Sequence, residues 1–244
     1  MHNPLFGEFM GTLVLILMGN GTNSNVLLSK TNGNNSGWIV ISTGWFLAVM
    51  AGVAVAQACG SPGAHINPAV TLAVAIISGD FSNVAGFVAA QMLGAFVGAT
   101  LVWLHFLPHW TFTNDPGLKK ACFCTAPAIR NTPTNIISEI IGTFMLFLII
   151  ASVLSKGVVG SAGAVAPGLV PFLVGCVVWV IGIGLGGTTG FPINPARDLG
   201  PRIAHAILPI SGKGDSDWSY AMVPVIGELI GGALAGLFVK MAGI

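Results

Sequence analysis

Two copies of the tetrapeptide Ile-Asn-Pro-Ala are the residues of this chain whose types and spacing could do chemistry. Asparagine is a preferred helix N-cap and proline is preferred at the first helical position, so each copy predicts a helix start. A helix N-terminus carries about half a positive charge and free N–H groups. If both starts faced one space, they would form a positive site whose asparagine amides donate hydrogen bonds. The residues assigned to this site are Asn67, Pro68, Ala69, Asn194, Pro195 and Ala196.

Arg197 follows directly after the second copy, in the first turn of its predicted helix. A cation is unfavourable at the positive end of a helix dipole, so we expect a functional reason for this residue. Its guanidinium offers five donors in a fixed fork, which could hold a hydroxyl group and repel cations. A structural salt bridge is the alternative. Asp198 is disfavoured as the partner because adjacent residues do not share a helix face.

Two glutamates, Glu8 and Glu139, stand in matching Glu-x-x-Gly-Thr segments within apolar runs. We expect them to accept N–H bonds from the irregular chain that leads into the two predicted helices. A proton relay is the weaker alternative. Glu228 is expected nearer a membrane surface. His65 is expected to support the loop before the first predicted short helix by packing and hydrogen bonding. Its backbone carbonyl is expected to be one of the acceptors that line a pore.

The chain offers no residue set that is typical of an enzyme or a nucleic-acid-binding protein. No nucleophile–base pair or cluster of metal ligands stands out, so neither a metal nor a cofactor is predicted. Basic residues do not gather into a nucleic-acid site. The four cysteines are interpreted as structural. Cys59 and Cys176 look buried, and Cys122 and Cys124 lie in a polar loop.

The composition indicates a membrane protein. The chain is 54% hydrophobic and 7% charged, whereas a soluble domain carries about 25% charged residues. A membrane helix needs about 20 apolar residues to cross a hydrocarbon core of about 30 Å. A soluble helical protein is the alternative, but it would have almost no charged surface. Six spans are predicted, near 4–28, 37–58, 83–106, 134–155, 168–188 and 218–241.

Two further apolar stretches, near 68–78 and 195–207, are too short to cross, and each follows one tetrapeptide. The segment "GEFMGTLVLIL" matches "SEIIGTFMLFL", and "QMLGAFVGA" resembles "ELIGGALAG", so the halves repeat. Each half holds three crossings and one half-length helix. Three is odd, so the second half is inverted and the short helices meet near the midplane. We expect one transmembrane channel domain over 1–244, with repeats at about 1–110 and 130–244 and a joining loop at 106–133.

The sequence resembles the aquaporin family, and its glycerol-facilitator branch in particular. The resemblance covers essentially the whole chain and is carried by "GAHINPAV", "GFPINPARDLGP" and the paired Glu-x-x-Gly-Thr segments. Asp198, directly after the arginine, is characteristic of the glycerol-conducting branch. The resemblance implies an all-α membrane protein, with six transmembrane helices in a right-handed bundle and two half-spanning re-entrant helices in an inverted repeat. It also implies a homotetramer with a pore in every subunit, and cytoplasmic termini.

The resemblance further implies a selectivity filter made of Trp45, Gly182, Phe191 and Arg197. Gly182 falls where water-selective members carry a histidine, and losing that side chain would widen the gap. Trp45 and Phe191 would face the carbon skeleton of a polyol. Arg197 and loop carbonyls would bind its hydroxyl groups.

Two positions of this filter depart from a simple match. The assignment of Trp45 requires a two-residue insertion in "QACGSPGAH", so Ala48 and Val49 remain alternatives. Pro192 stands where a smaller residue is typical, and a proline cannot donate a backbone N–H.

The sequence predicts passive conduction of glycerol, other small uncharged solutes and water, with protons and ions excluded. A water-selective channel is one alternative, against which Gly182 argues. A proton-coupled secondary transporter is the other, with Glu8 and Glu139 as its coupling sites. The expected surroundings are the lipid of a plasma membrane, which the short termini suggest is bacterial. The count of basic residues in the loops runs mildly against cytoplasmic termini.

Overall fold

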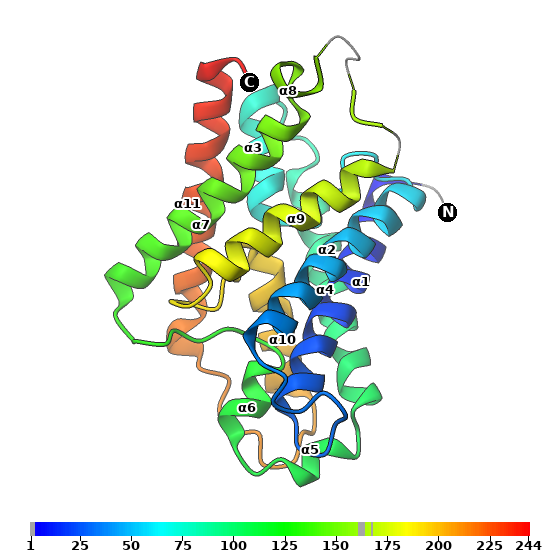
Figure 1. Ribbon diagram of the computed structural model, residues 1–244, viewed down its shortest axis with the longest axis vertical. Coiled ribbons are helices and arrows are strands. Elements are labelled where there is room, and N and C mark those ends of the chain that lie inside the picture. Colours follow the sequence, from blue (N-terminus) through cyan, green and yellow to red (C-terminus); the bar gives the residue numbers. More distant parts are fainter. Residues whose placement is uncertain (1–2, 161–163, 167) are drawn as a thin grey trace.

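The computed structural model describes residues 3–160, 164–166 and 168–244, which form helices and loops and contain no strand (Figure 1). Within this described part, five helices are long and apolar enough to cross a membrane. Their bounds lie close to five of the six predicted spans. They are α1 (Pro4–Leu27), α2 (Trp38–Ala58), α4 (Val84–His105), α7 (Thr132–Leu154) and α11 (Trp218–Ala242).

The remaining predicted span contains α9 (Leu169–Gly184), which is apolar but only 16 residues long. At 1.5 Å per residue it measures about 24 Å, less than a full hydrocarbon core. It ends before position 188 because the chain reads Gly-Leu-Gly-Gly there, and glycine is unfavourable in a helix interior. The other described connections contain the short helices α5 (His109–Phe112), α6 (Pro116–Ala121) and α8 (Lys156–Val159).

The two half-length helices are α3 (Pro68–Ser78) and α10 (Pro195–Ile207). Each begins as the tetrapeptide predicts, with proline at the first helical position and asparagine as the N-cap. The Asn67 side chain accepts from the Ala69 amide at 2.9 Å, and the Asn194 side chain accepts from the Ala196 amide at 3.0 Å. The N-cap bonds therefore fix where both short helices start.

A lysine covers the C-terminal end of each half-length helix. The Lys240 ammonium donates to the Ile76 carbonyl of α3 at 3.0 Å. The Lys213 ammonium donates to three carbonyls at the end of α10, at 2.6–2.8 Å. Each ammonium lies against the negative end of a helix dipole, which is a favourable place for a cation.

The helices pack as two interlocked repeats. In the first repeat α1 contacts α2 and α4, and in the second α7 contacts α9 and α11. Each short helix packs against the last long helix of the other repeat, α3 against α11 and α10 against α4. The repeats therefore complete each other's core rather than folding as separate units.

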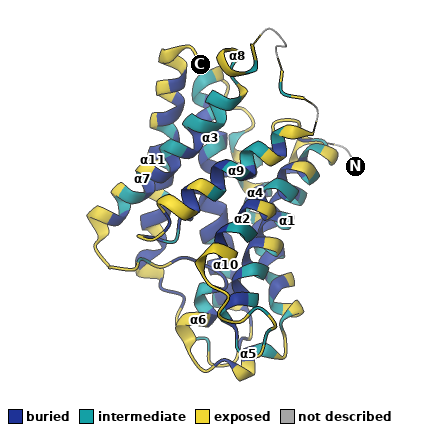
Figure 2. Cartoon of the chain, viewed as in Figure 1, coloured by how far each residue is buried: buried dark blue, intermediate teal, exposed yellow. Residues whose placement is uncertain are grey.

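Buried residues gather where the helices face one another, and the outer helix faces are exposed (Figure 2). Large apolar side chains occupy much of this outer surface, which suits lipid rather than water. Examples from the five long helices and α9 are Leu47, Leu93, Leu104, Ile137, Val180 and Leu234.

Glycines allow the closest helix contacts. A Cβ atom added at Gly94 of α4 would lie 2.3 Å from the Phe9 carbonyl oxygen of α1. A Cβ atom added at Gly232 of α11 would lie 2.6 Å from the Ala69 carbonyl oxygen of α3. In both cases the neighbour is backbone, so a side chain there would force the helices apart.

We predict that Gly94→Ala lowers the thermal stability of the detergent-purified protein, by about 2–3 kcal/mol in unfolding free energy, because overpacking against backbone cannot relax. Gly21→Ala in α1 is the matched control, since nothing lies within 4 Å of its added Cβ atom. That control should be neutral or slightly stabilising, since alanine is the better helix former. Equal melting temperatures for the two variants would contradict the packing argument.

Candidate functional site

A cavity of about 340 Å³ lies where the two short helices meet. One side is aliphatic and comes from the long helices. The other side comes from the loops that lead into α3 and α10, together with Arg197. The aliphatic side includes Leu15, Val49, Val53, Leu146, Ile150 and Val178. The cavity is therefore mostly apolar, with the polar side chains of His65, Asn67, Asn194 and Arg197 on its second side.

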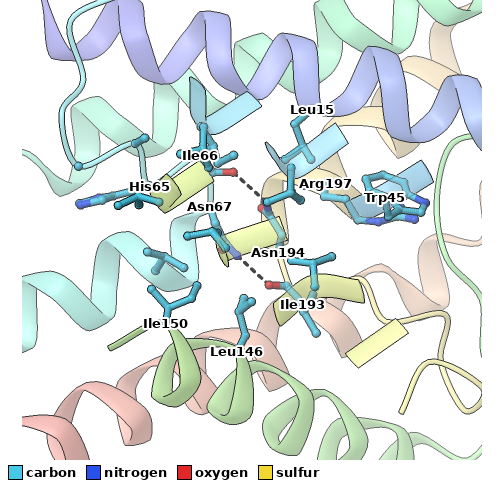
Figure 3. A pocket seen from close by; sticks show the side chains of 18 of the residues that line it. Leu15, Trp45, His65, Ile66, Asn67, Leu146, Ile150, Ile193, Asn194 and Arg197 are labelled. Atoms are coloured by element: carbon cyan, nitrogen blue, oxygen red, sulfur yellow. Dashed lines mark hydrogen bonds between the residues drawn. The ribbon is translucent and has the colours of Figure 1, made fainter. Parts of the chain in front are cut away.

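The two asparagines bind across the repeats (Figure 3). The Asn67 side-chain nitrogen donates to the Ile193 carbonyl at 2.8 Å, and the Asn194 nitrogen donates to the Ile66 carbonyl at 2.8 Å. Each amide group has a second N–H that these bonds do not use. Both asparagines line the cavity, so the two tetrapeptides meet there through these side chains, whereas Pro68, Ala69, Pro195 and Ala196 do not border it.

The loops before the short helices share an uncommon backbone conformation. Four residues other than glycine have positive φ angles near +40°, and they are Ala64, Ile66, Phe191 and Ile193. Positive φ is unfavourable for bulky and β-branched residues and costs about 1–3 kcal/mol each. Two of them, Ile66 and Ile193, supply the carbonyls that the asparagines bind. The unfavourable backbone conformation therefore occurs at the residues whose carbonyls point at the asparagine side chains.

Arg197 lies over the face of Trp45, with its guanidinium carbon 4.1 Å from the ring centroid. Trp45 is held in turn by a 3.0 Å hydrogen bond from its indole nitrogen to the Asn23 side chain. In the described part of the chain Arg197 forms no salt bridge, and its Nη1 atom has no hydrogen-bond partner. Arg197 is 4% exposed and borders the cavity, with the carboxyl groups of Asp198, Glu228 and Glu139 near it on the protein side.

Trp45, Phe191 and Arg197 line the same cavity, as the filter assignment requires. Val49, an alternative to Trp45, lines it as well, whereas Ala48 does not. Gly182 does not border the cavity either. A Cβ atom added there would lie 3.0 Å from the Phe191 ring, so this glycine lies behind the ring. Gly182 therefore lies next to the predicted filter residue Phe191, and its own place in the filter stays a prediction.

Glu8 is the acceptor for the first loop, as expected. One carboxylate oxygen accepts from the Ser61 hydroxyl at 2.6 Å and the His65 amide at 2.8 Å. The other accepts from the Ile66 amide at 2.6 Å and the Gln91 side chain at 2.8 Å. All four donors converge on one buried carboxylate, which therefore holds the loop in place.

His65 supports this loop in the way that the sequence analysis expects. Its Nδ1 atom lies 3.1 Å from the Thr71 hydroxyl, and its ring packs edge-on against Phe87 with centroids 5.2 Å apart. The residue also lines the cavity (Figure 3).

The second loop is held differently. Neither oxygen of Glu139 has a hydrogen-bond partner among the described residues, although Thr189 and the Ile193 amide lie close by. Glu228 accepts from the Asn194 amide at 2.9 Å instead, and it is fully buried. Glu139 therefore lies against the second loop beside the Ile193 amide, as expected, whereas the expectation of a surface position for Glu228 is wrong. Pairing Glu228 with Gln91 in the internal repeat is the signal that could have found it.

Asp198 does not pair with Arg197. It binds a buried loop instead. One of its oxygens accepts from the amide and the hydroxyl of Thr125, each at 2.7 Å. The other accepts from Arg202 at 2.7 Å, one helical turn later. Arg202 is fully buried and also donates to the Thr125 carbonyl at 2.9 Å. Arg202 is not among the residues predicted from the sequence, although i,i+4 spacing from an aspartate on a helix is a recognisable signal of an ion pair.

The segment that Asp198 holds contains Cys122 and Cys124, and both are buried. Asn20 of α1 binds the same segment by donating to the Phe123 carbonyl at 3.2 Å. Cys59 and Cys176 are only partly buried. The expected burial of the cysteines is therefore reversed, because this part of the joining loop folds inward between α1 and α10.

Comparison with known proteins places this geometry in a family. The family model described as "Major intrinsic protein" matches residues 2–239. A "Probable glycerol uptake facilitator protein" of Thermotoga maritima is 56% identical, covering 93% of this chain and 94% of that protein. The "Glycerol uptake facilitator protein" of Bacillus subtilis is 50% identical, covering 97% of this chain and 84% of that protein.

A solved structure agrees with the fold. The aquaglyceroporin from Plasmodium falciparum superposes with a TM-score of 0.83 at 29% identity, covering 97% of this chain and 94% of that one. The six apolar helices and the two half-length helices in an inverted repeat are thus the aquaporin fold. The chain belongs to the major intrinsic protein family.

Proposed function

We propose that this protein is a passive channel for glycerol and other small uncharged solutes, which also conducts water and excludes protons and ions. The observation that carries the proposal is the two-sided cavity beside Arg197. A polyol has a carbon edge and a hydroxyl edge, which match its aliphatic wall and its polar wall. The names of the bacterial relatives and of the solved structure support the same solute.

The proposed passage involves no covalent chemistry. Glycerol loses part of its water shell beside Arg197, whose free donors bind a hydroxyl group. Trp45 and Phe191 contact the carbon skeleton. The solute then meets the second N–H groups of Asn67 and Asn194. Each lost water contact is exchanged for a contact with the wall, so the solute crosses without a large barrier.

The proposed exclusion of ions uses the same residues. The N-termini of α3 and α10 and the Arg197 guanidinium place positive charge along one stretch of the lumen. This charge opposes hydronium and other cations, and amide donors at the midplane interrupt a continuous chain of hydrogen-bonded water. Glu8 is already bound by four donors, which disfavours it as the coupling site of a proton-driven transporter.

Stopped-flow measurements on proteoliposomes test the proposal. Glycerol should enter vesicles that contain the protein faster than empty vesicles, and the rate should not depend on an imposed pH gradient. Fast water flux with glycerol flux equal to that of empty vesicles would favour a water-selective channel. Uptake against a glycerol gradient, driven by pH, would favour a secondary transporter.

We predict that Gly182→His slows glycerol more than water, with about a tenfold loss of glycerol permeability if the filter loses one favourable contact. The new side chain would meet the Phe191 ring at 3.0 Å and the Ser42 hydroxyl at 3.3 Å, and so push the ring into the pathway. Gly184→His is the matched control, because nothing lies within 4 Å of that position. Equal losses in both variants would argue against a role for the Phe191 ring position.

We further propose that residues 1–244 form one channel domain, with repeats at about 1–110 and 130–244, in the plasma membrane of a bacterium. Six crossings place both ends on the same side, and the start of α1 and the end of α11 lie away from α5 and α6 (Figure 1). We propose that this side is cytoplasmic and that four copies assemble in the lipid. The exposed apolar helix faces support both a lipid environment and contacts between copies.

A further inference from the structure

The two repeats differ at one buried polar position. The internal repeat pairs Gln91 of α4 with Glu228 of α11. In the first repeat the Gln91 amide donates to the Glu8 carboxylate at 2.8 Å. In the second repeat the glutamate of the first helix, Glu139, has another carboxyl group near it instead of an amide.

Glu139 and Glu228 lie close together where α7 packs on α11. A Cβ atom added at Gly227, next to Glu228, would be only 2.5 Å from the Cβ atom of Glu139. The two glutamates are 1% and 0% exposed. The amide of Asn194 donates to one Glu228 oxygen at 2.9 Å, and the other Glu228 oxygen has no partner among the described residues. Glu139 lies beside the neighbouring Ile193 amide and the Thr189 hydroxyl.

The charges around this pair balance only if it carries one proton. Arg197 and Asp198 face it from α10, and Arg202 pairs with Asp198. The neutral hydroxyl of Tyr220 faces it from α11, and neither α3 nor α9 contains an ionisable acid or base other than Cys176. Three carboxylates would otherwise lie against two guanidinium groups in the interior. An uncompensated buried charge is strongly unfavourable, and two adjacent carboxyl groups do not both ionise readily.

We propose that Glu139 and Glu228 share one proton, with Glu228 as the positioning residue that holds the Asn194 amide and Glu139 as its hydrogen-bond partner. The shared proton supplies the donor that the Gln91 amide supplies in the first repeat. The pair therefore holds the second loop in the position where Asn194 can bind the first loop at the midplane. Its effect on permeability rests on the proposed glycerol conduction, whereas the shared proton does not.

Infrared spectroscopy of the protein in liposomes tests the shared proton directly. The wild-type protein at neutral pH should show the carbonyl stretch of a buried protonated carboxylic acid, and that band should shift on deuteration. Glu139→Gln and Glu228→Gln should each abolish it, because the remaining carboxylate then has an amide donor, as Glu8 has. Asp80→Asn, which changes an exposed acid, is the control and should keep the band. A wild-type spectrum without the band, or a band that persists in either glutamine variant, would overturn the proposal.

Permeability separates positioning from general stability. Glu228→Leu leaves the Asn194 amide unpaired and should reduce glycerol permeability per folded protein about tenfold, an effect typical of one unpaired buried amide. Glu228→Gln keeps an oxygen acceptor and should restore most of that loss. A folded leucine variant with wild-type permeability would refute the positioning role. If the leucine variant does not fold, the glycerol permeability of the glutamine variant tests the positioning role, and the infrared band tests the shared proton. A wild-type protein that does not pass glycerol would refute the proposed function. The infrared result would still show whether Glu139 and Glu228 share a proton.

Discussion

Arg197→Leu should make the channel leak cations, with proton and sodium flux rising by up to about a thousandfold. Two unit charges about 4 Å apart repel by about 4 kcal/mol at an effective dielectric constant of about 20, which corresponds to that factor. Arg197 borders the cavity and has no salt-bridge partner in the described part of the chain, so a cation that enters the lumen meets its charge directly. Leucine keeps an apolar side chain over Trp45 and removes only the charge and the donors. Flux of a pH-sensitive dye in proteoliposomes measures the leak.

Arg197→Lys separates charge from geometry. Lysine keeps the positive charge but lacks the planar fork of donors, and its ammonium is a flexible point charge. It should therefore keep most of the cation barrier and lose part of the glycerol permeability. If neither the leucine variant nor the lysine variant leaks more than the wild-type protein, the barrier belongs to the helix N-termini and not to the arginine.

Glu8→Leu should prevent the protein from reaching its folded state. Glu8 accepts four buried hydrogen bonds, from Ser61, His65, Ile66 and Gln91. A hydrogen bond to a charged group contributes about 1.5–3 kcal/mol, so losing all four costs at least about 6 kcal/mol. That is comparable with the whole unfolding free energy of many domains, about 5–15 kcal/mol. The yield of monodisperse protein on size exclusion in detergent measures the effect.

Glu8→Gln is the informative companion variant. Its single amide oxygen can keep some of the four donors, but its NH₂ group faces the Gln91 amide and creates a new clash of donors. An intermediate yield and a lower melting temperature are expected. A Glu8→Leu protein that purifies and melts like the wild type would show that the loop is held by other contacts.

The sequence predicted the spans because their signals are local. Long apolar runs identify helices long enough to cross a membrane. An Asn-Pro pair identifies a helix start, and α3 and α10 begin where those pairs place them. The C-terminal end of α9 was less well placed because an apolar run continues through its glycines after the helix has stopped.

The parts of the site that the sequence missed depend on contacts between distant segments. Cys122 lies in a loop that looks polar, and its burial depends on partners supplied by α1 and α10. The position of Gly182 behind Phe191 depends on how α9 meets the second loop. The role of Glu228 depends on a bond to Asn194, which lies 34 positions away in the chain. No local pattern specifies such pairs.

The loop charges illustrate the same limit. A count of basic residues assumes that they are free to respond to the membrane. Lys119 instead donates to the Ser211 carbonyl, and Lys120 and Arg130 both pair with Asp217. Lys30 lies 3.8 Å from the centre of the Phe112 ring. These cations take part in local structure, so a count of them reports less on orientation than the rule assumes.

The lysines at the outer ends of α3 and α10 have a consequence for the electric field at the centre of the membrane. A short helix is a pair of opposite poles, and at a distance the two poles largely cancel. Here the ammonium groups of Lys240 and Lys213 neutralise the outer negative poles. Each inner pole is then opposed less by its outer pole, so its potential declines more gradually along the lumen. These two lysines, about 20 Å from Asn194 in the case of α10, therefore extend the reach of the proposed central barrier to cations.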